Sequence, residues 1–324
     1  MKTKTLFLLL ILSSLLQAKY TNCTFKNKNY SDVCEQAVKQ GVSYQYANEF
    51  LTSYFKTKKY DEVSWTYLQP NKIKHHQEQE KKANNVLVKF IPKMVQNLQE
   101  YKEVYDYVEK EYGVNREIIA AILLKETKLG KIKPSHDAFI VFNTMVVRTK
   151  PNSPREKWLL KMGKTNMAAI IKHCYKLGVK PEQCNLPSSY AGAVGIPQFM
   201  PNSFIYAKSY VNDVADLTKM EDAIVSAAFF LHKKADFTKL IDWDRMPDIP
   251  KVEALWYEYD YKTKNASFVY ESSKSGKTYN SFTKDKPQLQ EMKEYTKKIM
   301  RYNNSSNYAV GVMRLAYEAH YSLN

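Results

Sequence analysis

The chain has 324 residues, and its 49 lysine and arginine side chains outnumber the 33 aspartates and glutamates, which gives a formal net charge of +16. Such a charge favours an acidic partner, such as a nucleic acid, an anionic lipid or an acidic polymer, and it does not determine a fold. Only 9 glycines occur, and leucine, lysine, glutamate and alanine recur at helical spacings. The composition therefore excludes a protein built from tight hairpins and predicts an all-α fold.

The first residues have the pattern of an export signal. Two lysines precede an aliphatic run over residues 6–16, and a small residue follows at Ala18. The run is shorter than the ~20 residues of a membrane-spanning helix and no comparable run follows, so we expect a signal peptide cleaved near Ala18 and no transmembrane segment. A lipoprotein carries a cysteine directly after the cleavage site, whereas the first one here is Cys23. We therefore expect an exported protein without a lipid anchor, for which nucleic acid is not the expected partner.

The four cysteines fall into two pairs that are close in sequence, Cys23 with Cys34 and Cys174 with Cys184. In an oxidising compartment this spacing favours two short disulfide loops. Three pairings are formally allowed, and we favour the local one. His173 stands beside Cys174, but the spacing matches no common zinc pattern, so we expect no metal site.

The apolar spacing divides the rest of the chain into helical and irregular stretches. Residues 19–68 have the pattern of short helices, and the polar stretch 69–85 is either a linker or an exposed helix. Helical periodicity then continues over 86–243. Aromatic and serine-rich clusters over 247–290 indicate loops or a small strand pair, which we interpret as an irregular insertion.

The pattern near the end of the chain predicts two closing helices, over about 289–300 and 306–319. We expect the chain to comprise the signal peptide, 1–18, an N-terminal helical segment with a linker, 19–85, and one main domain, 86–324, that carries the insertion. No internal repeat is visible.

The spacing predicts a helix over 116–129, with Asn115 at its N-cap and Gly130 at its C-terminal cap. Glu126 follows Ile119 by seven residues and Ile122 by four, which places a carboxylate on the apolar face. Burial there disfavours the charged form and raises the pKa toward the range that a general acid needs. On spacing alone, a buried ion pair between this glutamate and a lysine or arginine is an equal alternative.

Three segments together resemble the membrane-bound lytic transglycosylase B family of peptidoglycan lyases. The first runs from Tyr112-Gly113-Val114 through Glu117 to Glu126, Thr127 and Gly130, and is similar to the family's segment around its catalytic glutamate. The second, residues 189–203, reads SYAGAVGIPQFMPNS, and the third, residues 301–310, reads RYNNSSNYAV. The similarity of pattern extends over about 90–317, most of the chain.

The resemblance implies a lysozyme-like catalytic core and a periplasmic carbon–oxygen lyase. Such an enzyme cuts the β-1,4 bond between N-acetylmuramic acid and N-acetylglucosamine in peptidoglycan and leaves a 1,6-anhydromuramoyl end, with Glu126 acting first as acid and then as base. The implied partner is the peptidoglycan glycan strand, with no cofactor and no nucleic acid. The resemblance identifies no partner among cell-wall synthesis or secretion proteins.

The resemblance also assigns substrate-binding residues. It implies that Ser189 and Gln198 form hydrogen bonds near the glutamate and the sugar, that Phe199 supplies an apolar wall, and that Tyr308 orients the glutamate. The remaining residues that it places along the cleft are Tyr190, Phe230, Tyr302 and Asn303. Without the resemblance, a tight interhelical turn is the favoured interpretation of the glycine- and proline-rich segment, and Tyr308 is equally a core residue after a serine cap.

Two departures from the family's pattern carry expectations. Family members often have a short acidic calcium loop after the second segment, but residues 210–216 lack its alternating ligands, so we expect no calcium. Phe230 stands where the family commonly presents a tyrosine, which removes one hydroxyl contact. Two other functions stay open: a muramidase-type hydrolase with a second carboxylate such as Asp137, and a non-catalytic peptidoglycan-binding protein.

Overall fold

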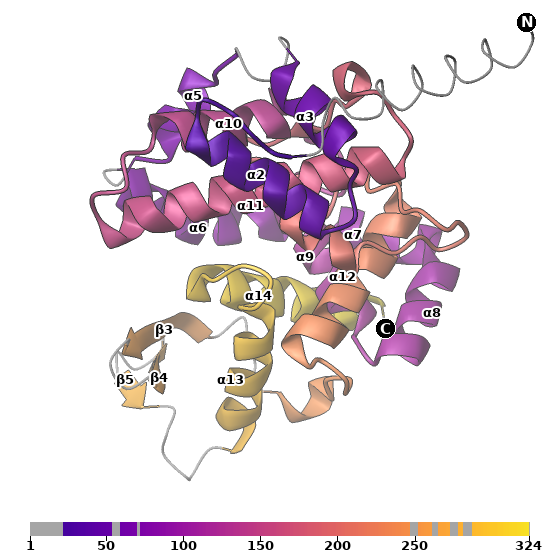
Figure 1. The fold of residues 1–324 in the computed structure, drawn as a ribbon. Coiled ribbons are helices and arrows are strands. Elements are labelled where there is room, and N and C mark those ends of the chain that lie inside the picture. The colour runs from indigo at the N-terminus through magenta and orange to yellow at the C-terminus, as the bar shows by residue number, and fades with distance from the viewer. Residues whose placement is uncertain are drawn as a thin grey trace, which may run out of the picture. The chain divides into compact units, whose positions relative to one another are not determined.

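The computed structural model describes residues 22–53, 59–69, 72–246, 252–260, 265–272, 278–280 and 287–323. The predicted signal peptide and its cleavage site lie outside these residues. Figure 1 shows the helices and strands of the chain. The chain divides into two compact units. Unit 1 comprises Met1–Gln69, Pro134–Val194 and Phe199–Ile205, and unit 2 comprises Pro70–Lys133, Gly195–Gln198 and Tyr206–Asn324. The predicted domain limits at 18, 85 and 86 stay a prediction.

Unit 1 is a set of helices around one apolar core. Its elements are α2 (Lys28–Lys39), α3 (Tyr44–Thr52), α5 (Glu62–Tyr67), α10 (Ala138–Arg148) and α11 (Pro154–Lys176), the short helix η3 (Pro181–Gln183), and the antiparallel two-residue strands β1 (His136–Asp137) and β2 (Pro187–Ser188). Helix α11 packs against both α10 and α2. The rings of Phe50, Phe139 and Phe142 are buried in this core, where their apolar area drives the packing.

Two disulfides staple unit 1, Cys23 to Cys34 and Cys174 to Cys184. Both are the local pairs favoured from the sequence, so that prediction is confirmed. The second joins the last turn of α11 to the segment that leads into β2 and the 189–194 loop. By restricting the unfolded chain, a loop of this length contributes on the order of 2 to 3 kcal/mol.

Unit 2 surrounds one central helix, α9 (Arg116–Thr127). Helices α7 (Ile91–Glu100), α8 (Lys102–Tyr112), α12 (Met220–Ala235) and α14 (Ser306–Leu323) all pack against α9. The other elements are α6 (Ile73–Leu87), η2 (Val88–Phe90), η5 (Trp243–Arg245) and α13 (Pro287–Ile299), while η4 (Pro201–Tyr206) crosses from unit 1. The side chains of Ile118 to Leu123 are fully buried, so α9 is apolar on nearly every face, as expected of a helix enclosed by others.

The predicted helix around Glu126 is confirmed, and Asn115 is its N-cap residue as predicted, but the side chain of Asn115 and the end of the helix differ from the prediction. The Asn115 side chain makes no cap hydrogen bond; it accepts from the backbone N–H of Ile241 at 2.7 Å and donates to the carbonyl of that residue at 3.2 Å. The helix ends at Thr127 rather than at 129, because Lys128 and Leu129 already have left-handed backbone angles, with φ of 50° and 58°. Gly130 continues this turn with φ of 76°.

The insertion contains more regular structure than was predicted. Strands β3 (Val252–Asp260), β4 (Asn265–Ser272) and β5 (Thr278–Asn280) form a three-stranded antiparallel sheet with the strand order β3-β4-β5. The polar stretch 69–85 is largely helix α6 rather than a linker. The all-α class with a small β insertion is confirmed. Among the residues that the structure describes, no helix is long and apolar enough to cross a membrane.

Candidate active site

Glu126 lies in the last turn of α9 and is half-buried. Burial raises the pKa of its carboxyl group from 4.5 to about 7, against the lowering effects of a hydrogen bond from Tyr308 and of the Lys125 charge; the Glu80 charge raises it further. Desolvation therefore outweighs the stabilising contacts. A carboxyl group with this pKa is present in both protonation states near neutral pH, so it can donate a proton and later accept one.

Tyr308 holds one oxygen of this carboxyl group. Its hydroxyl donates a hydrogen bond to Oε1 of Glu126 at 2.7 Å, and its side chain is only 3 % exposed. Burial and the nearby Glu126 charge raise the pKa of Tyr308 well above its ordinary value, so the phenol stays a donor. Tyr308 is placed by the start of α14, where Ser305 Oγ accepts from the Tyr308 backbone N–H at 3.2 Å.

Three polar residues near Tyr308 were not predicted from the sequence: Glu80, Asn84 and Lys125. The Lys125 ammonium hydrogen-bonds Asn84 and lies 5.1 Å from the centroid of the Tyr308 ring. Glu80 accepts a hydrogen bond from the Ser305 hydroxyl. Burial lowers the pKa of Lys125. Glu80 and Asn84 are one helical turn apart on α6, so they share a face of that helix. This spacing was the only sequence signal that could have indicated that they act together.

The end of the second motif, Gly195 to Gln198, belongs to unit 2 and is tied to the Glu126 helix. Thr127, the residue after Glu126, donates from its hydroxyl to the carbonyl of Ile196 at 3.0 Å. The hydroxyl of Tyr302 donates to the carbonyl of Pro197 at 2.6 Å. The Gln198 side chain donates to the Gly195 carbonyl at 2.9 Å, and its own backbone is left-handed with φ of 50°. Such strain at a non-glycine residue is typical of functional loops.

Gly195 fits only as glycine. Its φ is 75°, and a Cβ atom there would lie 2.5 Å from the Cβ of Leu217 and 2.6 Å from the carbonyl oxygen of Leu217. The backbone of the loop therefore lies directly against the segment before α12. There the N–H of Ile196 donates a hydrogen bond to the carbonyl of Leu217 at 2.8 Å.

An aromatic group adjoins the loop within unit 2. The ring of Phe230 packs edge-on against Tyr302 at a centroid distance of 4.9 Å and against Tyr206 at 5.1 Å. Lys234 places its ammonium 4.6 Å from the Phe230 centroid. Phe230 is only 3 % exposed, so it shapes the site through Tyr302. Asn303, next in the chain, is exposed.

The other predicted substrate-binding residues belong to unit 1. Ser189 closes a turn in which its hydroxyl accepts from the Ala193 N–H at 3.2 Å, and Phe199 exchanges backbone hydrogen bonds with Val194 at 2.9 and 3.0 Å. The Phe199 ring is 2 % exposed, and the ring of Tyr190, 36 % exposed, packs against Tyr67. Unit 2 thus brings together Glu126, Gln198, Phe230, Tyr302 and Tyr308, whereas Ser189, Tyr190 and Phe199 belong to unit 1.

The loop where the family often binds calcium is held by a side chain. One oxygen of the Asp222 carboxylate accepts from the Ser209 hydroxyl and the Tyr210 N–H, both at 2.8 Å, and the other accepts from the Asp216 N–H at 2.7 Å. All three bonds come from the 209–216 loop, so the Asp222 carboxylate holds this loop in place. Over the described part of the chain, no group of three or more His, Cys, Asp or Glu side chains is arranged to hold a metal ion. The absence of a calcium ion stays a prediction.

The fold is shared with several solved lytic transglycosylases. The soluble lytic transglycosylase SltB1 from Pseudomonas aeruginosa is similar with a TM-score of 0.60 and 19 % identity, over 91 % of this chain and 99 % of that one. The Escherichia coli lytic transglycosylase Slt35 in complex with bulgecin A gives 0.62 and 19 %, over 95 % and 98 %. SltB3 from Pseudomonas aeruginosa in complex with NAG-anhNAM-pentapeptide gives 0.55 and 16 %, over 89 % and 77 %. No curated protein matches the chain.

This protein therefore has the fold of the solved lytic transglycosylases. Residues 26–317 match the model of the transglycosylase SLT domain family, which covers most of the sequence, so the chain belongs to that family. It is accordingly an enzyme, a lytic transglycosylase that acts on peptidoglycan. The family resemblance inferred from the three motifs is confirmed.

Proposed function

We propose that Glu126 is the single catalytic acid and base of this lytic transglycosylase. The observation that carries the proposal is the half-buried carboxyl group of pKa about 7 that accepts a 2.7 Å hydrogen bond from Tyr308. Its protonated form donates to the glycosidic oxygen between N-acetylmuramic acid and N-acetylglucosamine. The carboxylate that results then accepts the proton of the muramoyl C6 hydroxyl as that oxygen closes onto C1.

One carboxyl group suffices for this reaction because the nucleophile belongs to the substrate. Glycosidases that use water or a covalent intermediate generally need two carboxyl groups at a defined separation. Holding the sugar in a reactive pucker makes the ring closure intramolecular and replaces the second group. Tyr302 and Gln198 are proposed to line the sugar site in unit 2, with Tyr308 as the residue that positions Glu126.

The alternative of a hydrolase, which needs a second catalytic carboxylate, has less support than the single-carboxylate reaction. Asp137, the residue considered from the sequence, caps α10 by accepting the N–H of Ile140 at 3.0 Å, which is a structural use of its charge. Glu80 is the acidic group whose charge acts on Glu126, and it is hydrogen-bonded by Ser305. We propose on these grounds that the reaction yields a 1,6-anhydromuramoyl end rather than a reducing end.

Product analysis in ¹⁸O-labelled water tests this proposal. A digest of purified peptidoglycan by the wild-type enzyme is expected to give 1,6-anhydromuramoyl products that carry no label, because water does not enter the reaction. Labelled reducing muramic acid ends would show hydrolysis and contradict the proposal. Binding of peptidoglycan without any product would support the non-catalytic alternative.

We also propose that the protein acts in the periplasm after cleavage of a signal peptide near Ala18. Two disulfides in unit 1 support an oxidising compartment. The mass of the mature N-terminal peptide from a periplasmic extract tests this: a start at or near Lys19 supports it, and an intact Met1 contradicts it.

A further inference from the structure

A cavity of about 230 Å³ in unit 2 is lined by α7 and by the turn that follows Glu126. Its wall includes Phe90, Lys93, Leu124, Lys128, Leu129 and Lys131. The cavity is smaller than the roughly 300–1,000 Å³ typical of sites for drug-sized ligands. It suits the end of a chain, one or two residues long, rather than a disaccharide.

The cavity is strongly cationic. Lys93, Lys128 and Lys131 line it against one acidic residue, Glu100, which leaves two positive charges uncompensated. In the part of the chain that the structure describes, no carboxylate forms an ion pair with any of these three lysines. Two of the ammonium groups lie over one aromatic ring: Lys93 at 5.4 Å and Lys128 at 5.5 Å from the centroid of Phe90. The ring holds the cations at the cavity without neutralising their charge.

The backbone strain after Glu126 has a consequence at this cavity. Lys128 and Leu129 adopt left-handed angles that cost roughly 1–2 kcal/mol for each non-glycine residue. The turn directs the Lys128 ammonium over Phe90, so the residues that end the catalytic helix also form the cavity wall. Strain of this kind is retained where the surrounding structure uses the conformation.

The cavity wall lies close to Glu126 along the chain. Helix α9 ends at Thr127, and Lys128 in the cavity wall follows Glu126 by two residues, so the Cα atoms of Glu126 and Lys128 lie at most about 7.6 Å apart. A peptide of five residues spans at most about 17 Å when extended. Peptidoglycan carries such acidic peptide stems on its muramic acid residues, so a stem has the length to extend from a sugar at Glu126 to this cavity.

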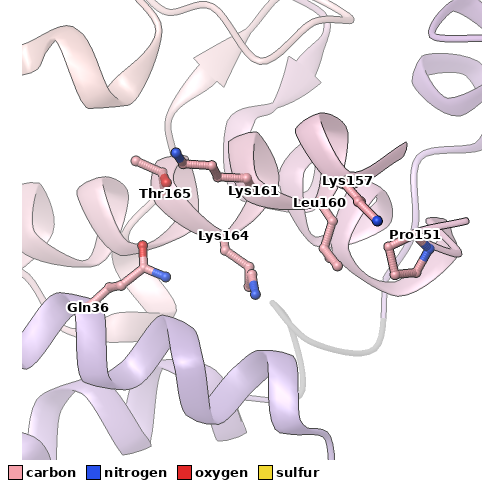
Figure 2. A pocket seen from close by; sticks show the side chains of 7 residues that line it. All are labelled: Gln36, Pro151, Lys157, Leu160, Lys161, Lys164 and Thr165. Carbon is pink, nitrogen blue, oxygen red and sulfur yellow. The ribbon is translucent and has the colours of Figure 1, made fainter. Parts of the chain in front are cut away.

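We propose that the cavity binds the terminal carboxylate of a peptidoglycan peptide stem. Lys93 and Lys128 bind the carboxylate, and the apolar wall formed by Phe90, Leu124 and Leu129 contacts the side chain of the terminal residue. This inference rests on the proposed function for its choice of ligand. Figure 2 shows another cavity with a lysine-rich wall, in unit 1, where Lys157, Lys161 and Lys164 all project from α11. There Lys164 is paired with Asp32 at 2.9 Å, and none of the described aromatic rings lines the cavity to contact the side chain of a terminal residue.

Calorimetric titration of the full chain with a free stem pentapeptide tests the proposal without requiring turnover. The matched probe is the same peptide with its terminal carboxylate amidated. We expect the acid to bind and the amide to bind roughly tenfold or more weakly, as for loss of a charge-assisted hydrogen bond. Lys93→Gln and Lys128→Gln are each expected to raise the Kd of the acid by about tenfold and to reduce the difference between the two probes.

Lys102→Gln is the control for overall charge, because Lys102 is an exposed lysine of α8 that pairs with Asp106 outside the cavity. It is expected to bind the acid as the wild type does, and melting curves show that each variant is folded. Equal binding of acid and amide, no binding of either, or the same loss in Lys102→Gln would overturn the proposal. The titration needs no catalysis, so a failure of the Glu126 assignment, seen as turnover in a Glu126 variant, is distinguishable from a failure of this site.

Discussion

Tyr308→Phe removes one hydroxyl group and leaves the buried ring in place. That hydroxyl donates to Glu126 at 2.7 Å, and the hydrogen bond lowers the pKa of the carboxyl group. A hydrogen bond to a charged group contributes about 1.5–3 kcal/mol, and one pKa unit corresponds to about 1.4 kcal/mol. The pKa of Glu126 is therefore expected to rise by about one to two units from its value of about 7.

The pH profile of kcat/KM measures this shift. Because Glu126 must begin the reaction protonated, the rate falls as the pH rises through its pKa, and in the variant this alkaline limb is expected to move upward by about one to two units. We also expect kcat to fall by roughly tenfold, since the carboxyl group loses the contact that orients it. Tyr295→Phe is the matched control, because it removes a buried tyrosine hydroxyl that donates to the Leu240 carbonyl at 3.2 Å. An alkaline limb that stays in place, or moves downward, in Tyr308→Phe would refute the reasoning.

Three further predictions concern stability. The pKa of Glu126 is raised from 4.5 to about 7, so the folded protein favours the protonated form. Protonation therefore contributes at most about 3 kcal/mol to the free energy of unfolding. This stabilisation is present below pH 4.5 and is lost as the pH rises through 7. Glu126→Gln is neutral at every pH, so its Tm advantage over the wild type should grow between pH 5 and pH 8; a constant difference would contradict the raised pKa. Gly311→Ala places a Cβ atom 2.1 Å from Oδ1 of Asn84 and should lower the free energy of unfolding by about 1–3 kcal/mol in urea titrations; an unchanged midpoint would show that Asn84 moves away freely. Removal of divalent metals with a chelator should leave the Tm unchanged, because Asp222 already holds the 209–216 loop, whereas a Tm loss that calcium restores would disprove this.

The sequence predicted the helix of Glu126 because its signals are local. The seven- and four-residue spacings to Ile119 and Ile122 depend on helical geometry alone, and the two disulfides join cysteines separated by 11 and 10 positions. The role of Asn115 could not be predicted in the same way. Its side chain bonds the backbone of Ile241, 126 residues away, in preference to capping its own helix.

The surroundings of the glutamate were also beyond local reasoning. Glu80 and Asn84 stand in a polar stretch that has no apolar face, and they reach the site only because α6 packs against α14. The roles of Tyr308 and Tyr302 came from the family resemblance, since a tyrosine after a serine cap is compatible with an ordinary core position. Helix α9 also ends two residues before the predicted limit, because Lys128 and Leu129 adopt left-handed angles that their residue types disfavour.

The most direct test of the account is turnover by Glu126→Gln on purified peptidoglycan, measured as 1,6-anhydromuramoyl product and accompanied by a melting curve. The amide keeps the volume of the side chain and can neither donate the proton nor accept it later. The account predicts a folded protein, with a Tm at or above that of the wild type at pH 8, that binds glycan and forms no product above the enzyme-free background. Near-normal turnover by the folded variant would contradict the assignment of Glu126 as the catalytic acid and base.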